Sequence, residues 1–138
     1  MKKIIPLLLL TIATTFSTVI ITPSIANDIR QERVQFKSGA TSTTIEHSIK
    51  GYEIIDYVVN ARKGQLMNVS MATDNGANYF NILEPGQNEV AIFNGSTSGN
   101  QFEKTLAQSG DYKIRVYMMR SAARRNETAN YRLEIIIY

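Results

Sequence analysis

The clearest pattern in the chain is a strict alternation of side chains over residues 112–119. Successive side chains of a β-strand point to opposite faces, so this period of two predicts a strand with one buried face and one displayed face. The buried face would carry Tyr112, Ile114, Val116 and Met118, and the displayed face Lys113, Arg115, Tyr117 and Met119. Residues 129–138 repeat the pattern, with Tyr131, Leu133, Ile135 and Ile137 on one face.

Six further short runs are rich in residues that favour strands, and turn-forming residues separate them. The predicted strands are residues 34–37, 43–50, 54–60, 65–72, 79–83, 90–93, 112–119 and 129–138. Residues 95–100 are expected to form a longer, mobile loop. No long segment has the period of a helix, so the pattern favours an all-β fold, an antiparallel sandwich of about eight strands in two sheets.

The first 26 residues have the pattern of an export signal. Lys2 and Lys3 precede an apolar run, and Ser24-Ile25-Ala26 supplies the small residues that a signal peptidase reads, so we expect cleavage after Ala26. An uncleaved membrane anchor is the alternative, but the second half of the run is rich in Thr and weakly apolar for a span. The sequence therefore predicts a periplasmic protein with a signal peptide over residues 1–26 and one domain over residues 27–138.

Charge and cysteine content narrow the choice of partners. Loss of Lys2 and Lys3 lowers the formal net charge from +3 to +1, so neither nucleic acid nor a membrane is an expected partner of the mature chain. The chain has no cysteine and one histidine, His47, which excludes disulfides and argues against a transition-metal site. The sequence is compatible with a monomer and with a homodimer.

No motif for catalysis is present in the sequence. His47 lies in a polar strand with no nucleophile motif near it, and we interpret it as a surface residue. Asp74-Asn75-Gly76 lacks the further acidic residues of a calcium loop and is interpreted as a turn. We therefore expect neither an enzyme, nor a cofactor, nor a metal.

Arginines gather after the strand at residues 112–119 and define the candidate binding surface. Arg120, Arg124 and Arg125 follow this strand directly. They could form a solvated face with internal partners such as Glu127. Arginine, however, offers a planar fork that suits carboxylates, and the neighbouring Tyr117, Met118 and Met119 are residue types favoured in interface cores. The pattern indicates a partner that presents carboxylates.

Three segments carry a resemblance to a known family. They are SGDY at residues 109–112, RVYMMR at residues 115–120 and AARRNETANY at residues 122–131. They resemble the periplasmic lysozyme inhibitors, with the invertebrate-type (I-type) branch as the nearest match and the goose-type (g-type) branch as its relative. Residues 51–65 and 78–102 extend the likeness over most of the mature chain. Residues 51–65 also resemble the β-sandwich domain that follows the peptidase unit of many secreted bacterial proteases.

The resemblance implies an inhibitor of host lysozyme, of the I-type by preference, that inserts loop side chains into the substrate cleft. The family's serine and arginine correspond to Ser109 and Arg120. A hydroxyl and a guanidinium are donors that could bind the carboxyl groups of a glycosidase cleft. The expected lysozyme-binding residues are Ser109, Tyr112, Tyr117, Arg120, Arg124 and Arg125, with Tyr112 mainly holding the turn at Ser109. A carbohydrate-binding accessory module is the alternative, with Tyr52, Tyr57 and Tyr79 as its candidate aromatic residues.

Overall fold

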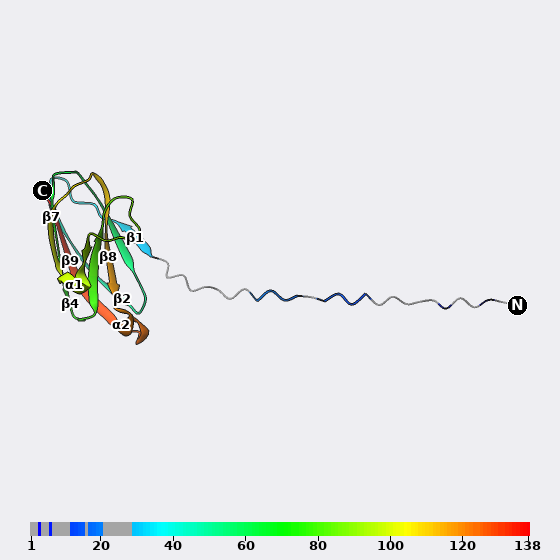
Figure 1. Ribbon diagram of the computed structural model, residues 1–138. Coiled ribbons are helices and arrows are strands. Elements are labelled where there is room, and N and C mark those ends of the chain that lie inside the picture. Colours follow the sequence, from blue (N-terminus) through cyan, green and yellow to red (C-terminus); the bar gives the residue numbers. More distant parts are fainter. Residues whose placement is uncertain (1–2, 4–5, 7–11, 16, 21–28) are drawn as a thin grey trace.

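Two β-sheets pack face to face in the computed structural model, which describes residues 3, 6, 12–15, 17–20 and 29–138 (Figure 1). The five-stranded sheet has the spatial order β1 (Arg30–Arg33), β3 (Ile55–Ala61), β8 (Gly110–Met118), β5 (Asn78–Leu83) and β6 (Phe93–Asn94). The four-stranded sheet has the order β2 (Ser42–Lys50), β9 (Thr128–Ile137), β4 (Leu66–Thr73) and β7 (Gln101–Thr105). This arrangement confirms the all-β sandwich. Cleavage after Ala26 falls outside the described residues and stays a prediction, as does the domain boundary that it sets.

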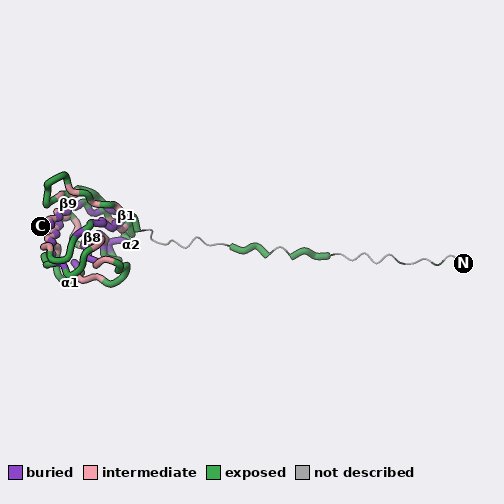
Figure 2. The backbone as a smooth tube through the Cα atoms, turned by 90° about the horizontal axis from the view of Figure 1, so that it is seen from above, coloured by how far each residue is buried: buried purple, intermediate pink, exposed green. Residues whose placement is uncertain are grey.

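The core lies between the two sheets, as the alternation in β8 and β9 predicts. The six residues Tyr112, Ile114, Val116, Leu133, Ile135 and Ile137 all belong to one buried cluster, and none is more than 6% exposed. Buried residues gather inside the domain and exposed ones cover it (Figure 2). Each fully buried side chain of this kind contributes about 1.5 to 3 kcal/mol, which accounts for stability without disulfides. Within the described part of the chain, no helix has the length and apolar character needed to cross a membrane.

A pair of tyrosine hydroxyls joins the two sheets inside the core. Tyr57 of β3 and Tyr131 of β9 are 1% and 4% exposed, and their hydroxyl oxygens lie 2.6 Å apart. Burial, followed by the hydrogen bond with Tyr57, raises the pKa of Tyr131 far above its ordinary value. Each hydroxyl therefore satisfies the other in a place that water does not reach. The buried position of Tyr57 also removes it from the aromatic residues available to a ligand.

The structure differs from the predicted strands at both edges of the five-stranded sheet. The first strand is β1 at Arg30–Arg33 and not residues 34–37, and it pairs with β3 in parallel, whereas the other pairings are antiparallel. Only Phe93 of the predicted strand at 90–93 lies in a strand, the short β6. These edge segments have few partners, so their own sequence pattern constrains them weakly.

The predicted loop at residues 95–100 is also more ordered than expected. Gly95–Ser98 form a single helical turn, α1, and β7 starts at Gln101. Gly95 packs directly on β5, because a Cβ at this position would lie 2.4 Å from the carbonyl oxygen of Phe80. The segment is thus pinned to the sheet by a contact that only glycine allows.

A segment that we call the strap, residues 84–92, crosses the outer face of the five-stranded sheet. Side chains of β8 hold it, since Arg115 Nη1 donates to the carbonyl oxygen of Asn88 at 3.0 Å and Lys113 Nζ to that of Gln87 at 3.4 Å. Asp56, on the same outward face of β3, is only 1% exposed. The strap therefore covers part of the outer face of this sheet and helps to bury polar side chains on that face.

Candidate functional site

The helical turn α2 (Arg120–Arg124) forms one end of the sandwich, between β8 and β9. Alanine and arginine favour helices, and Ala122 and Ala123 bury the inner side of the turn. Asn126 ends it with a φ of 56°, and a Cβ on Gly51 would lie 2.7 Å from the side-chain oxygen of that Asn126. The backbone N–H of Gly51 donates to the carbonyl oxygen of Glu127 at 2.9 Å. The turn is therefore docked closely on the β2–β3 connection.

The predicted arginines divide into two kinds. Arg125 forms an ion pair with Glu127 at 2.6 Å, and it is the main cause of the lowered pKa of that carboxyl. Arg120 and Arg124 are exposed, and neither forms an ion pair with any described residue. They stand four residues apart in α2, which places both side chains on one face. Two unpaired guanidinium groups thus point to solvent from the same turn.

Exposed aromatic and thioether side chains surround these arginines. Met119, next to α2, is 43% exposed, and Tyr52, on the connection beneath α2, is 48% exposed. Tyr117 is half-buried on the outer face of β8, with its ring centroid 6.5 Å from that of Tyr79. We call this surface the arginine end: Arg120, Arg124, Met119, Tyr52 and Tyr117. The position of Tyr52 at this surface does not follow from the sequence, because only the fold brings the β2–β3 connection under α2.

Ser109 lies before β8 in a turn at residues 106–110, which we call the serine turn. Tyr112, two residues beyond it, lies in β8 and contacts this turn. Ser109 is exposed, but its Oγ accepts a hydrogen bond from the backbone N–H of Lys63 at 2.8 Å. Tyr112 is 1% exposed, and its hydroxyl donates to the carbonyl oxygen of Gln108 at 2.7 Å. This hydrogen bond ties Tyr112 to the turn and the ring is buried, while its role in binding lysozyme stays a prediction.

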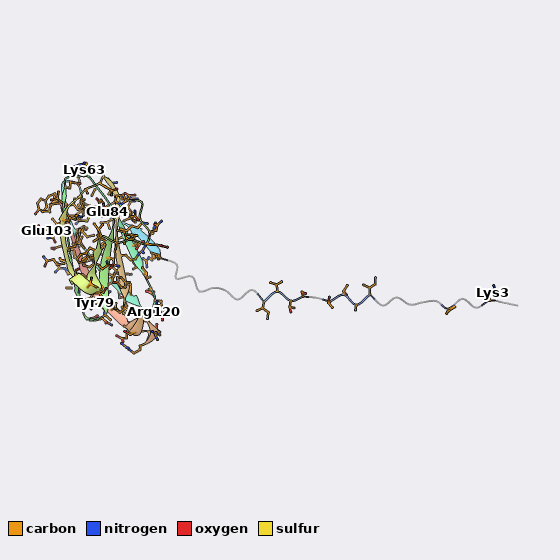
Figure 3. All side chains as sticks on the ribbon, in the orientation of Figure 1. Lys3, Lys63, Tyr79, Glu84, Glu103 and Arg120 are labelled. Carbon is orange, nitrogen blue, oxygen red and sulfur yellow. The ribbon has the colours of Figure 1, made fainter. Side chains whose placement is uncertain are left out.

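The two groups of predicted site residues lie at opposite ends of the molecule. Ser109 precedes β8 and Arg120 follows it, so the whole strand separates them, a distance of roughly 30 Å at the usual rise per residue. Figure 3 shows Lys63, which binds Ser109, at one end and Arg120 at the other. The expectation that Ser109 and Arg120 both serve as plugs in the lysozyme cleft stays a prediction. A single inserted loop cannot carry both.

A buried ion pair lies beside the arginine end and was not expected from sequence. Arg115 of β8 faces Asp56 of β3 across the strands, and Nε and Nη2 bind the two carboxylate oxygens at 2.7 and 2.9 Å. The Asp56 side chain is 1% and that of Arg115 16% exposed. The hydrogen bonds with Asp56 raise the pKa of Arg115. A fork of this kind fixes the plane of the Arg115 guanidinium.

Two further residues that the sequence analysis considered for chemistry, His47 and Asp74, are exposed. His47 lies on β2. The Asp74 carboxylate accepts hydrogen bonds from the backbone and side chain of Asn130, which suits its interpretation as a turn residue. Among the described residues, no group of three or more His, Cys, Asp or Glu could hold a metal ion.

Comparison with known proteins gives relatives over most of the domain. No protein-family model matches the chain. It is 32% identical over 106 residues to an inhibitor of g-type lysozyme from Escherichia coli (strain K12), covering 75% of this chain and 78% of that protein. It is also similar to Aeromonas hydrophila PliG, a periplasmic inhibitor of g-type lysozyme, with a TM-score of 0.74 and 34% identity over 80% of this chain and 97% of that chain.

A more distant likeness concerns the fold alone. The pre-peptidase C-terminal domain of a Bacillus anthracis collagenase has a TM-score of 0.55 and 19% identity, over 80% of this chain and 96% of that domain. This confirms the resemblance to protease-associated sandwiches at the level of architecture. The two relatives above act on g-type lysozyme, so the expected placement in the I-type branch is not supported.

Proposed function

Because the chain belongs to the PliG family of periplasmic inhibitors of g-type lysozyme, we propose that it inhibits a g-type lysozyme by placing its arginine end in the substrate cleft. The observation that carries this proposal is the 32% identity to the Escherichia coli inhibitor across 106 residues. The protein is a periplasmic lysozyme inhibitor and not an enzyme. The I-type specificity expected from sequence becomes the alternative for the assay.

The chemistry of the arginine end supports its assignment to the cleft. Most glycoside hydrolases cut through a pair of carboxyl groups that flank the scissile bond. Arg120 and Arg124 offer two exposed guanidinium groups on one face of α2, and guanidinium binds carboxylate through paired, charge-assisted hydrogen bonds. Tyr52, Tyr117 and Met119 around them supply the aromatic and thioether surface that is common in interface cores.

The serine turn suits a supporting role. The Ser109 hydroxyl oxygen already holds the Lys63 N–H, and Tyr112 is buried beneath it. That bond uses Ser109 as an acceptor and fixes its position in the turn, while the hydroxyl proton stays free to donate. Because this turn lies a whole strand away from the arginines, we propose that Ser109 and Tyr112 mainly shape the turn, while Tyr117, Arg120 and Arg124 contact lysozyme. Arg125, paired with Glu127, would contribute less.

The proposal is tested with purified residues 27–138 against lysozymes of the g-type, the I-type and the chicken type (c-type). The assay follows lysis of a bacterial cell-wall suspension. We expect inhibition of the g-type enzyme above the other two. Arg120→Ala should weaken binding by about 2 to 5 kcal/mol, which is roughly 30-fold or more in Ki, because it leaves a partner carboxylate unpaired. Arg124→Ala should act in the same direction.

Arg62→Ala is the matched control, because Arg62 is an exposed arginine next to Lys63 at the serine-turn end. It removes the same charge and should leave Ki unchanged. If Arg62→Ala weakens inhibition while Arg120→Ala does not, the serine-turn end faces the enzyme and the assignment of the arginine end is wrong. Stronger inhibition of I-type than of g-type lysozyme would contradict the proposed specificity.

A further inference from the structure

A pocket of about 230 Å³ opens on the outer face of the five-stranded sheet, next to the arginine end. Its lining includes Tyr52, Glu53, Ile54, Asn81, Arg115 and Tyr117. Asn81 and Arg115 are cross-strand neighbours on β5 and β8, and Arg115 is in turn the neighbour of Asp56 on β3. The floor of the pocket is therefore the polar pair Asn81 and Arg115 on β5 and β8, with Asp56 next to Arg115 on β3 outside the lining, and Tyr117 and the β2–β3 connection form its walls.

Two of the lining side chains, Asn81 and Arg115, have N–H donors without a partner among the described residues. The Asn81 side-chain oxygen accepts from the backbone N–H of Gly95 at 3.2 Å, which directs the amide nitrogen away from α1. That nitrogen donates to no described residue, and it is not among the buried unpaired atoms, so it is open to solvent. Arg115 has five N–H groups, of which Asp56 and Asn88 take three, leaving two. The floor offers donors and needs an acceptor.

The charges around the floor favour a neutral acceptor over an anion. Asp56 neutralises Arg115 through both carboxylate oxygens, and Glu53 places a further carboxylate in the lining. A ligand carboxylate would approach these two acidic groups against a single compensated guanidinium. An amide carbonyl meets the same donors without that repulsion. The pocket therefore selects a neutral, strongly accepting group such as an acetamide.

The walls add a surface for a sugar ring. Tyr52 and Tyr117 line the pocket with phenol rings, Ile54 supplies an apolar side chain for a methyl group, and the Glu53 carboxylate can accept hydrogen bonds from hydroxyls. A volume of about 230 Å³ is below the range of drug-sized sites and suits a single sugar unit. We propose that the pocket binds one N-acetylhexosamine unit, with its acetamido oxygen on Asn81 Nδ2 and Arg115 and its ring against Tyr52 or Tyr117.

This glycan site is a second activity whose argument does not rest on lysozyme inhibition, but its walls Tyr52 and Tyr117 belong to the arginine end, so a sugar and lysozyme would compete for them. A protein side chain with an amide could also satisfy the floor donors, but it would not use the Glu53 carboxylate, which is exposed and can accept a ligand hydroxyl beside the Lys50 N–H. A sugar uses the donors, the aromatic wall and the carboxylate together. N-acetylhexosamines are also the units of the polymer that lysozymes cut, so such a site would hold the inhibitor close to the place of attack.

The test is a ¹⁵N NMR titration of residues 27–138 with the trimer of N-acetylglucosamine, and in parallel with the glucose trimer, which has the same linkage but no acetamido group. We expect saturable shifts at the pocket residues with the acetylated trimer, and affinity at least roughly tenfold weaker for the glucose trimer. Equal binding of both trimers, shifts that gather elsewhere, or no shifts with about 20 mM of the acetylated trimer would each overturn the proposal.

Asn81→Asp is the decisive variant, because it keeps an oxygen for the Gly95 N–H, removes the amide donor, and adds a negative charge that disfavours an acceptor oxygen in the pocket. It should weaken binding of the acetylated trimer at least roughly tenfold. Tyr52→Ala, at an exposed position, should also weaken it without affecting the core. Asn68→Asp makes the same chemical change on β4 of the other sheet and should leave binding unchanged. If the pocket variants weaken lysozyme inhibition but not sugar binding, the pocket serves the protein partner and the glycan proposal is wrong.

Discussion

Removing one hydroxyl from the tyrosine pair in the core should cost more stability than removing both. In Tyr57→Phe or Tyr131→Phe, the remaining hydroxyl stays in a site that is at most 4% exposed, and no other described side chain lies within hydrogen-bonding distance of it. An unpaired buried polar group of this kind costs about 1 to 3 kcal/mol. In the double variant no hydroxyl remains to be satisfied, and the two phenylalanine rings keep the shape of the core.

The double variant should therefore lie within about 1 kcal/mol of the parent protein. Urea unfolding of all four proteins, followed by circular dichroism at 25 °C, gives the free energies directly if the slopes with urea agree. We expect a coupling energy between the two positions of at least about 1 kcal/mol, with the double variant more stable than the sum of the single losses predicts. Strictly additive losses would show that the two hydroxyls do not satisfy each other.

Two further predictions concern the backbone and the surface charges. Gly95→Ala should destabilise the domain by about 1 to 3 kcal/mol or more, because its Cβ would lie 2.4 Å from the Phe80 carbonyl oxygen, whereas Gly76→Ala, with nothing within 4 Å, should change urea stability by less than about 0.5 kcal/mol. The pKa of Asp111 is lowered from 3.8 to about 2, first by its hydrogen bonds with Arg33, so its stabilising effect is complete above pH 4 and is lost as the pH falls toward 2. An NMR titration of the Asp111 carboxyl should give a midpoint at about pH 2, and Arg33→Ala should raise that midpoint. An unchanged midpoint would show that Arg33 does not lower the pKa of Asp111.

The sequence predicted the strands that have a buried face and missed much of what lies at the edges. In β8 and β9 a strict alternation leaves one register that buries the apolar face, so bounds and core residues came out within one or two positions. β1 has the sequence RQER, which shows no alternation of apolar and polar residues. Backbone pairing with β3 holds this strand in place. The hydrogen-bonding partner of such a strand is a property of the fold and cannot be read from its own residues.

The residues of the candidate site also divide into those that the sequence predicts and those that only the fold brings together. The exposed arginines of α2 follow from residue type and position after a strand. The length of the strand between Ser109 and Arg120 also implied that the two residues lie far apart. The family resemblance assigns both residues to the binding site and gives no distance between them. The pairing of Asp56 with Arg115, by contrast, joins residues that are 59 positions apart, and only the register of β3 on β8 brings them together.

The order of strands in space has a consequence for how the chain acquires its structure. β8 and β9 are the last two strands in the chain, yet β8 lies between β3 and β5, and β9 lies between β2 and β4. The earlier strands thus have no central partner until residues 110–137 are present, and neither sheet can assemble progressively from the N-terminal side. Folding must wait for contacts between distant segments, which places the rate in the millisecond to second range typical of β-sandwiches. A chain that crosses a membrane from its N-terminus would remain extended and open to proteases until its final strands emerge, and would then close both sheets together.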